Sequence, residues 1–486
     1  MTPDRSTFLE LAGQYAVVPV SMQVLADRET AVTAYEKLVG DEPGFLLESV
    51  EGGERWARWS FVGWNPEYTL SARGGVSKID RPEIELPPGN PLEVLESLIS
   101  GLSAAQYDGL PPLHTGAVGW LGYDAVRYVE HLPDSPPDDR GLPEMVWQFV
   151  GSLAAFDRMA QRITLVRNVF VGDDPEAQYE RAIADLQEAA ARLGEPSGYT
   201  VRRADWESAP PVARSTLDRE PFEAAVRRAK EYIVKGDAFQ IVISQRLEVP
   251  FDGDTFAVYR ALRMINPSPY LFYHRHPEVT VIGSSPELMT RVRGGVVYSR
   301  PIAGTRPRGA TLGEDERLAE ELLADPKERA EHVMLVDLAR NDIGRVCEYG
   351  TVAVDDLMVI ERYSHVMHIV SGVSGKLRSG IGPVEVVRAT FPHGTVSGAP
   401  KVRAMEIIDE LEPVARGPYA GAVGYIDFSG NIDTAICLRT VVAAAGKAWV
   451  QAGAGLVADS EPSAEYDETM NKAAAALAAI AGADHV

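Results

Sequence analysis

The sequence predicts an α+β fold in which two antiparallel β-sheets pack into a β-sandwich core with peripheral helices. Short apolar runs of alternating polarity recur in both halves of the chain, separated by glycine, proline and asparagine turns. Amphipathic helical segments lie between clusters of these strands, without the regular strand–helix alternation of a parallel sheet. The 486 residues, 45% of them hydrophobic, are sufficient for a large core.

The N-terminal half contains strands, two helices and then a linker. The segments expected in order are strands within 44–66, a helix at 91–102, a glycine-rich strand at 114–124, a hairpin at 148–171 and an amphipathic helix at 175–193. Residues 194–216 are polar and contain prolines, which favours a linker. We therefore expect an N-terminal region at 1–193 and a C-terminal region at 217–486.

The C-terminal region repeats this mixture of strands and helices. The expected segments are a helix at 222–236, strands at 238–249, 270–275, 279–285 and 294–306, a helix at 325–345, strands at 417–428 and 434–457, and a helix at 463–480. GAVGW at 116–120 and GAVGY at 421–425 are near repeats in similar strand contexts. This similarity predicts two related β layers.

Composition excludes several classes of partner and location. The net charge of −23 argues against binding to nucleic acid or to an anionic membrane, and an anionic small substrate would need local cations or a metal. The two cysteines, Cys347 and Cys437, fit a reducing cytosol and form no CxxC pair. Neither a signal peptide nor an apolar run long enough to span a bilayer is present, so we expect a cytoplasmic protein.

The helix expected at 325–345 has a strong start signal. Asp325 is a predicted N-cap, Pro326 suits the first helical position, and Glu328 completes a capping-box-like pattern. One stripe of this helix combines carboxylates and leucines, namely Glu328, Glu331, Leu335, Leu338 and Asp342. Apolar residues cover most of the remaining circumference and predict a buried helix. Its carboxylates require partners, which are either arginines or a metal ion.

The last predicted helix repeats this pattern. Glu465, Glu468 and Lys472 lie on one face, and Ser463 is a plausible N-cap. Acidic residues in a first helical turn also interact favourably with the helix dipole, which needs no ligand. Four carboxylates from two helices, without cysteine ligands, suit a hard divalent cation such as magnesium.

Two short segments and one histidine could bind or act on a substrate. In 301–309, Gly304 and Thr305 precede two arginines that could counter an anionic substrate, although an ordinary basic turn is the alternative. Residues 451–456 predict a small-residue loop whose N–H groups could hold a carboxylate. His368 lies in an apolar, strand-like segment, where a histidine is either a satisfied core residue or a catalyst. No Walker, dinucleotide or HExxH motif is present.

Several motifs in order resemble those of chorismate-utilising enzymes, and in particular the anthranilate synthase large subunits. They are GSSPE, PIAGTRPRG, DPKERAEHVMLVDLARND, ERYSHVMH, FPHGTVSGAPK, GPYAGAVGY, the segment around Arg439, AGAG and EYDETMNK. The resemblance is strong over 220–480 and looser over 15–155. It implies the sandwich fold with a site for chorismate and Mg²⁺, and the conversion of chorismate and ammonia to anthranilate and pyruvate, the first step of tryptophan biosynthesis.

The resemblance assigns roles to individual residues. It implies that Glu331 and Glu468 hold magnesium, with Glu328 and Glu465 beside them, and that the metal binds the ring carboxylate of chorismate. The implied chorismate contacts are Gly304, Thr305, Tyr419, Arg439, Gly453, Ala454 and Gly455, with Lys472 nearby. Glu287 would protonate the hydroxyl that leaves C4, and His368, supported by Thr395, would be the base of the later elimination.

Two positions distinguish this subfamily from its relatives. Isochorismate and salicylate synthases typically carry a lysine that activates water where this chain has Gln240. Enzymes that aminate chorismate at C4, the aminodeoxychorismate synthases, often carry a nucleophilic lysine where this chain has Ala303. Both alternatives are therefore disfavoured. A non-catalytic tryptophan-binding regulator with the same fold is disfavoured because the acids and His368 are all in place.

Regulation and ammonia supply also follow from the resemblance. LLES at 46–49 and NPSPYLF at 266–272 resemble a tryptophan feedback site with Ser49, Pro269, Tyr270 and Leu271 as contacts, where methionine is common in place of Leu271. Neither cysteine lies in a glutaminase nucleophile motif. The resemblance therefore implies a separate glutamine amidotransferase subunit, for which free ammonia substitutes.

Overall fold

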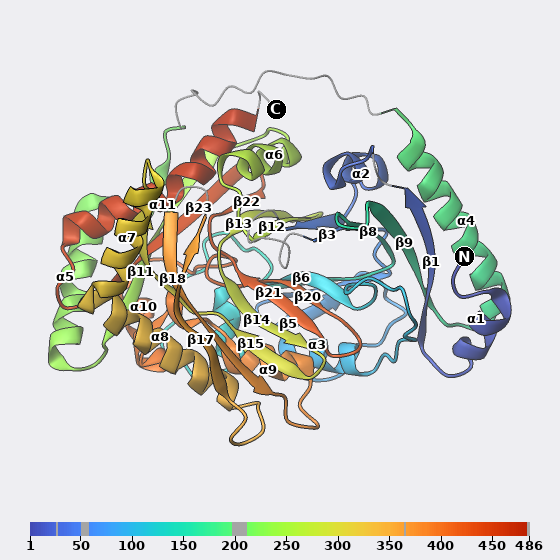
Figure 1. Cartoon of the computed structure of the whole chain (residues 1–486), viewed down its shortest axis with the longest axis horizontal. Helices are drawn as coiled ribbons and strands as arrows, with labels where there is room; N and C mark the ends of the chain where they lie inside the picture. Colours follow the sequence, from blue (N-terminus) through green and yellow to red (C-terminus); the bar gives the residue numbers. More distant parts are fainter. Residues whose placement is uncertain (26–27, 50–57, 197–210, 364–365, 484–486) are drawn as a thin grey trace.

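The structure, a computed structural model, describes residues 1–25, 28–49, 58–196, 211–363 and 366–483 (Figure 1). Its two large sheets are antiparallel throughout their strand pairs and carry helices on their outer sides, so the predicted α+β class is confirmed. None of the helices within these ranges is long and apolar enough to cross a membrane. The predicted boundary at 194–216 stays a prediction, because residues 197–210 lie outside the described ranges.

The first sheet contains twelve strands in the described residues. In spatial order they are β1 (Val17–Leu25), β9 (Arg162–Phe170), β8 (Ser152–Asp157), β3 (Trp59–Trp64), β2 (Gly44–Glu48), β12 (Tyr270–His276), β13 (Val279–Ser285), β22 (Thr440–Ala444), β23 (Lys447–Leu456), β11 (Gln240–Pro250) and β10 (Arg214–Ser215), with β19 (Gly398–Ala399) beside β11. Strands from both ends of the chain therefore share this sheet.

The second sheet contains eleven strands in the described residues. In spatial order they are β16 (Ile302–Pro307), β18 (Val366–Lys376), β15 (Val296–Ser299), β14 (Leu288–Arg293), β21 (Ile432–Ile436), β20 (Ala422–Ile426), β6 (Ala117–Leu121), β7 (Met145–Phe149), β4 (Tyr68–Arg73) and β5 (Val76–Ile79), with β17 (Ala353–Arg362) beside β18. The near repeats GAVGW and GAVGY lie on β6 and β20, which pair directly. The prediction that these repeats mark two separate β layers is therefore wrong, because both copies belong to the same sheet.

Helices cover the outer faces and the ends of the sandwich. They are α1 (Arg5–Ala12), α2 (Ala31–Leu38), α3 (Pro91–Ser100), α4 (Pro175–Gly194), α5 (Arg219–Lys235), α6 (Thr255–Ile265), α7 (Leu312–Ala324), α8 (Pro326–Gly344), α9 (Pro383–Thr390), α10 (Lys401–Leu411) and α11 (Pro462–Gly482), with 3₁₀ turns η1 (Tyr123–Tyr128) and η2 (Gly394–Val396). In Figure 1, α1 and α4 lie beside β1 and β9 at one end, and α7 and α8 lie beside β17 and β18 at the other.

Successive residues of a strand point to opposite faces of its sheet, so apolar side chains alternate between the core under the helices and the core between the two sheets. On β12, Leu271 and Tyr273 join the core beneath α2, α6 and α11, whereas Phe272 joins the layer between the sheets. Phe272 there belongs to the same apolar cluster as Trp120 of β6. This alternation holds each strand in register with one face toward each core.

Two of the chain's passages between the sheets lie next to each other. β13 of the first sheet is followed by Pro286 and Glu287 and then by β14 of the second sheet. β21 of the second sheet is followed by a turn containing Arg439 and then by β22 of the first. Because β13 pairs with β22 and β14 pairs with β21, the two crossings are adjacent. They bring Glu287 and Arg439 to the same part of the sandwich.

Helix α8 begins at the predicted N-cap but without the predicted capping box, and only part of its circumference is buried. The Asp325 carboxylate accepts bonds from the N–H groups of Lys327 and Glu328, which confirms the N-cap. The Asp325 N–H donates to the carbonyl of Glu321 in α7. The prediction of a helix buried all round is wrong, because Arg329, Val333, Asp337 and Arg340 form an exposed face. The polar residues of this face interrupt the apolar circumference.

Helix α11 begins at Pro462, one residue before the predicted start. Its N-cap is Glu461, and Pro462 occupies the first helical position, so Ser463 is not the cap. The helix packs beside α6 on the outer face of the first sheet, where it contacts β23 (Figure 1). This placement directs the Glu465–Lys472 segment toward the strand that carries the AGAG motif.

Candidate active site

Glu287 is a buried carboxyl group at the crossing between the sheets. It is 4% exposed, and the Thr395 hydroxyl donates a hydrogen bond to its Oε1 at 2.8 Å. Burial raises the pKa of Glu287 to about 8, against the smaller lowering effects of Thr395 and of the Lys472 ammonium. Glu287 therefore carries a proton at neutral pH and can act as a general acid. The prediction that Thr395 supports His368 is corrected, because the Thr395 hydroxyl bonds to the predicted acid Glu287, whereas His368 bonds to Gly304 and Thr305.

His393 completes this cluster and was not predicted from the sequence. Its Nδ1 lies 3.0 Å from the Thr395 hydroxyl and 3.7 Å from Glu287 Oε1. Burial, and next the charge of Lys401, lower the pKa of His393 to about 3, so its imidazole is neutral. The only signal in the sequence is its position two residues before Thr395 in FPHGTVSGAPK.

His368 lies on β18 and contacts the glycine bulge of β16. Its Nδ1 is 3.0 Å from both the Gly304 carbonyl and the Thr305 hydroxyl. Burial lowers the pKa of His368, and the Arg439 guanidinium contributes to the lowering, whereas the Gly304 carbonyl opposes it. The side chain is only partly buried. It is therefore a neutral, accessible imidazole that can accept a proton.

The carboxylates of α8 and α11 face one another across the site. Burial raises the pKa of Glu331, and the carboxylates of Glu328 and Glu468 raise it further. Burial also raises the pKa of Glu465, with Glu468 again adding to the effect. The effect of Glu468 on Glu331 shows that carboxylates of the two helices lie close enough for their negative charges to interact. Such a region favours binding of a cation.

Positive side chains already contact two of these carboxylates. Arg306 lies 3.2 Å from Glu328, so the predicted salt-bridge alternative holds for this acid, and Glu468 pairs at 2.6 Å with Lys472 of its own helix. Within the described residues, no three His, Cys, Asp or Glu side chains are grouped tightly enough to hold a metal ion. The oxygen donors and their shared charge nevertheless suit a hard cation such as Mg²⁺. Glu331 and Glu468 are the residues that could hold it.

Residues 451–456 belong to strand β23, so the loop predicted there is wrong. Gly453, Ala454 and Gly455 pair with β11, because backbone pairing does not require side chains. A Cβ on Gly453 would stand 2.7 Å from the Tyr419 hydroxyl, and one on Gly455 would stand 2.7 Å from Gln240 Nε2. The small residues thus admit Tyr419 and Gln240 next to the strand.

Polar contacts connect this strand with the carboxylates. Lys472 Nζ donates to the Gly453 carbonyl at 3.0 Å, and Gln240 Nε2 donates to Glu331 Oε1 at 3.2 Å. A Cβ on Gly304 (φ +66°) would stand 3.0 Å from Glu328 Oε2. The structure therefore joins the predicted chorismate contacts and the predicted metal ligands in one region.

The two arginines of PIAGTRPRG contact carboxylates of this chain. Arg306 bonds to Asp325 and Glu328, and Arg308 bonds to the buried Asp315. The prediction that these arginines counter substrate charge is therefore corrected. Their ion pairs connect β16 and the residue that follows it to α7 and α8.

The predicted inhibitor residues line a separate cavity of about 540 Å³. Ser49 lies next to Tyr270 because β2 pairs with β12, with Glu48 opposite Leu271. Pro269, Tyr270 and Leu271 line one side of the cavity, and residues of β14, β20 and β21 line the other. The cavity therefore lies between the two sheets, and its volume suits an amino-acid-sized ligand.

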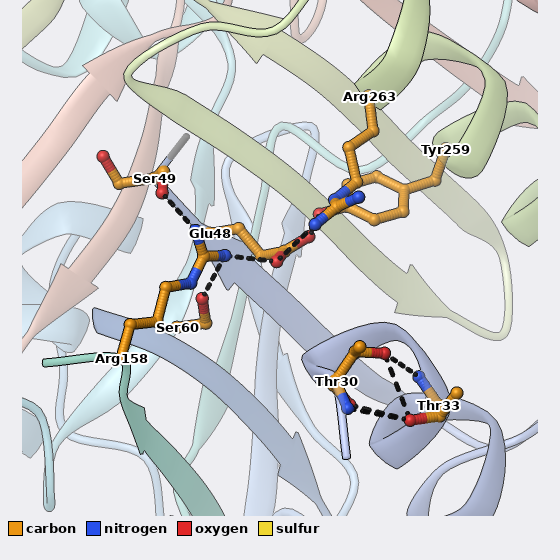
Figure 2. Close-up of polar contacts among 8 residues, drawn as sticks. All are labelled: Thr30, Thr33, Glu48, Ser49, Ser60, Arg158, Tyr259 and Arg263. Carbon is orange, nitrogen blue, oxygen red and sulfur yellow. Dashed lines mark hydrogen bonds and ion pairs between the residues drawn. The ribbon is translucent and has the colours of Figure 1, made fainter. Parts of the chain in front are cut away.

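The strand end beside this cavity is held by the buried Glu48 carboxylate (Figure 2). Tyr259 and Arg263 of α6 donate to it, each at 2.7 Å, and Arg158 donates at 2.8 Å. Arg158 also donates to the Ser49 carbonyl at 3.3 Å. Glu48 thus connects the backbone at Ser49 with α6, which packs beside α11.

We expect Glu48→Gln to lower the free energy of unfolding by about 2–3 kcal/mol, because two guanidinium groups lose their shared counter-charge. Urea denaturation measures this change. Glu42→Gln is the control, because Glu42 is exposed, and it should alter stability by less than about 0.5 kcal/mol. Equal stability of the two variants would contradict the structural role of the Glu48 cluster.

Comparisons with known proteins agree over nearly the whole chain. The family model of chorismate binding enzymes matches residues 42–478. Anthranilate synthase component 1 of Acetivibrio thermocellus is 46% identical over 98% of each chain. The protein of the same name from Mycobacterium bovis is 47% identical and covers 99% of this chain and 96% of its own length.

Solved structures show the same architecture. The crystal structure of anthranilate synthase component I from Streptococcus pneumoniae superposes with a TM-score of 0.77 at 35% identity, over 93% of this chain and 99% of that one. A menaquinone-specific isochorismate synthase from Escherichia coli superposes with a TM-score of 0.73 at 18% identity, over 98% of both chains. The second likeness concerns the fold alone.

Proposed function

This chain belongs to the chorismate-binding enzymes and, within them, to the anthranilate synthase component 1 subunits, and from that premise we propose its reaction and its regulation. The enzyme converts chorismate and ammonia to anthranilate and pyruvate, the first step of tryptophan biosynthesis. The observation that carries this choice of substrate and product is the 46–47% identity to component 1 relatives over almost the full length.

The first chemical step is the addition of ammonia at C2 with loss of the C4 hydroxyl. Hydroxide is a poor leaving group, so the step needs a proton donor beside C4. Glu287 is suited to this role because burial keeps it protonated at neutral pH. Arg439, at the neighbouring crossing between the sheets, supplies positive charge for a carboxylate of the substrate.

The second step removes pyruvate and makes the ring aromatic. It requires a base near C2, and His368 is neutral and partly accessible, with its Nδ1 fixed by Gly304 and Thr305. Its Nε2 is then the nitrogen that accepts the proton. Because the ring contact with Tyr363 also restrains the imidazole, the base is held in a defined orientation.

We expect His368→Ala to lower the rate of anthranilate formation about 10²-fold or more, because the elimination loses its base. The aminated intermediate, aminodeoxyisochorismate, should accumulate, since Glu287 is intact. Quenched reactions separated by chromatography measure both species. His131→Ala, at an exposed histidine, is the control. An unchanged rate in His368→Ala would remove this residue from the mechanism.

The reaction depends on Mg²⁺ in this proposal. Glu331 and Glu468 would hold the ion, with Glu328 and Glu465 beside them. A bound magnesium ion would neutralise the ring carboxylate of chorismate in a protein whose net charge is −23. Lys472 orients Glu468 through an ion pair and donates a hydrogen bond to the Gly453 carbonyl. The supporting observation is that the Glu468 carboxylate of α11 lies close enough to contribute to the raised pKa of Glu331 on α8.

Gln240 and Ala303 favour amination at C2 over the related reactions. Gln240 lies beside Gly455 and Glu331, within the proposed site, and an amide cannot activate water as a lysine amine does. Ala303, on β16, cannot be a nucleophile at C4. Aminodeoxychorismate synthase therefore remains the less favoured alternative.

Ammonia comes from a second component, which we propose to be a glutamine amidotransferase subunit. Both cysteines of this chain are buried, and burial raises their thiol pKa values, so neither is a thiolate nucleophile. Free ammonia at high concentration should replace the partner. Both subunits would work in the cytoplasm.

Tryptophan is the proposed feedback inhibitor. Its contacts would be Ser49, Pro269, Tyr270 and Leu271 in the cavity between the sheets. Tyr270 is held there by Arg291, which donates to its hydroxyl at 3.0 Å. The polar and apolar lining of this cavity supports a ligand with an ammonium group, a carboxylate and an aromatic ring.

A product assay tests the proposed function. The purified protein is given chorismate, magnesium and an ammonium salt at alkaline pH, and anthranilate is read by its fluorescence and mass. We expect anthranilate that disappears when magnesium is chelated and decreases when tryptophan is added. A 4-amino product would favour the folate-branch alternative, isochorismate would contradict the Gln240 argument, and absence of turnover would favour a regulatory protein.

A further inference from the structure

Glu287, Thr395 and His393 form a short chain of polar groups in the interior. The Thr395 hydroxyl lies 2.8 Å from Glu287 Oε1 and 3.0 Å from His393 Nδ1. The imidazole itself is 3.7 Å from the same carboxylate oxygen, which is beyond hydrogen-bonding distance. Both end groups have side chains that are about 95% buried. His393 therefore reaches Glu287 through the Thr395 hydroxyl.

Burial, and next the charge of Lys401, keep His393 neutral. The positive charge of Lys401, at the start of α10, lowers the pKa of His393. The Lys401 ammonium also pairs with the Asp342 carboxylate of α8 at 2.8 Å. Lys472 of α11 acts on Glu287 from the other side. His393 Nδ1 also accepts the backbone N–H of Thr395 at 3.4 Å. Nδ1 is thus the unprotonated nitrogen, and its lone pair faces Thr395.

We propose that His393 is a positioning residue that holds the Thr395 hydroxyl ready to accept a hydrogen bond from the acid form of Glu287. The hydroxyl has one hydrogen, so it donates either to His393 Nδ1 or to Glu287 Oε1. When Glu287 is protonated, its O–H donates to the Thr395 oxygen, and the hydroxyl hydrogen turns to His393. The inference rests on the proposed function, because the acid role of Glu287 belongs to that proposal.

The same three groups also explain how the hydrogen bond of the Thr395 hydroxyl changes when Glu287 gives up its proton. Ammonia forms the C2–N bond and the ring double bonds shift toward C4, while the Glu287 O–H bond breaks and its proton forms an O–H bond with the C4 oxygen. The C4–O bond breaks to release water, and the nitrogen at C2 loses its extra proton to solvent. The Thr395 hydroxyl then turns from His393 to the new carboxylate and stabilises it. His393 thus favours the acid form before the step, and Thr395 favours the carboxylate after it.

Replacing His393 by alanine should lower the pKa of Glu287. In His393→Ala the Thr395 hydroxyl has no Nδ1 to donate to and donates to Glu287 throughout, which favours the carboxylate. We expect the pKa of Glu287 to decrease by about half to one unit. His393→Asn offers an amide oxygen as the acceptor and should keep the pKa within about 0.2 units of the original.

Infrared spectroscopy measures this titration without turnover. The carbonyl band of protonated Glu287 is identified by subtracting the spectrum of Glu287→Gln, and its intensity is followed against pH in each folded variant. The same His393→Ala substitution is then made in a Thr395→Val background, where no hydroxyl connects the two groups. We expect the shift in the first background and no shift in the second.

Two results would overturn the proposal. One is a Glu287 titration that is unchanged in His393→Ala, and the other is an equal shift in the Thr395→Val background, which would mean that His393 acts by packing or by charge. Because the infrared titration requires no product, it is independent of the assay for anthranilate. A protein that shows the expected shifts but forms no aromatic amine supports the hydrogen-bond arrangement and rejects the proposed function.

Discussion

Glu287→Gln should lower kcat for anthranilate formation by roughly 10²–10⁴-fold, because the amide cannot donate the proton that the leaving hydroxyl requires. The intermediate should not accumulate, since the block precedes amination. In the unaltered enzyme the rate of this step should decrease as the pH rises through about 8, where Glu287 loses its proton. Stopped-flow fluorescence at constant free ammonia measures both effects.

Glu36→Gln is the matched control for this substitution. Glu36 lies on α2, and burial raises its pKa as it does that of Glu287, but it is remote from the crossing between the sheets. It should leave kcat and its pH dependence unchanged. A Glu287→Gln variant with unaltered kcat would remove Glu287 from the mechanism and would leave the amination step without an acid.

Glu331→Gln and Glu468→Gln should each abolish magnesium-dependent activity, with a loss of about 10²-fold or more. Each substitution removes one of the two carboxylates that interact across the space between α8 and α11. The fold should persist, because an amide of the same size relieves the repulsion between these acids. Calorimetric titration with Mg²⁺ in the presence of chorismate should show loss of binding, independently of turnover.

The control for the metal assignment is Glu320→Gln. Glu320 lies on α7, next to α8 in the chain, and its side chain is exposed. It should leave both magnesium binding and activity unchanged. Magnesium dependence that persists in both Glu331→Gln and Glu468→Gln would contradict the assignment of these ligands.

Local patterns predicted the fold class and many of its elements. The hairpin expected at 148–171 is formed by β8 and β9, and the helices expected at 175–193 and 325–345 are α4 and α8. The helical periods of α4 and α8 survive in the folded chain because one face of each helix is buried, whereas β8 is buried on both faces. The loop expected at 451–456 is instead part of β23, because its pairing with β11 depends on a distant strand that no local pattern indicates.

The site was predictable only in part. Helical spacing placed the two Glu-x-x-Glu pairs on single faces, whereas their approach across the site depends on how α8 and α11 pack. The crossings that bring Glu287 near Arg439 follow from the pairing of β13 with β22 and of β14 with β21, which no local pattern indicates. His393 could be recognised only once its contact with Thr395 was known.

The most direct measurement is a single turnover of chorismate with isotope-labelled ammonium and excess purified enzyme, with the products identified by mass and chromatography. The assignment predicts one labelled amino group on 2-aminobenzoate and one pyruvate for each chorismate consumed, in a reaction that stops when magnesium is removed. Label in a 4-amino product, or an unlabelled isochorismate, would contradict amination at C2 and with it the roles given to Glu287 and His368.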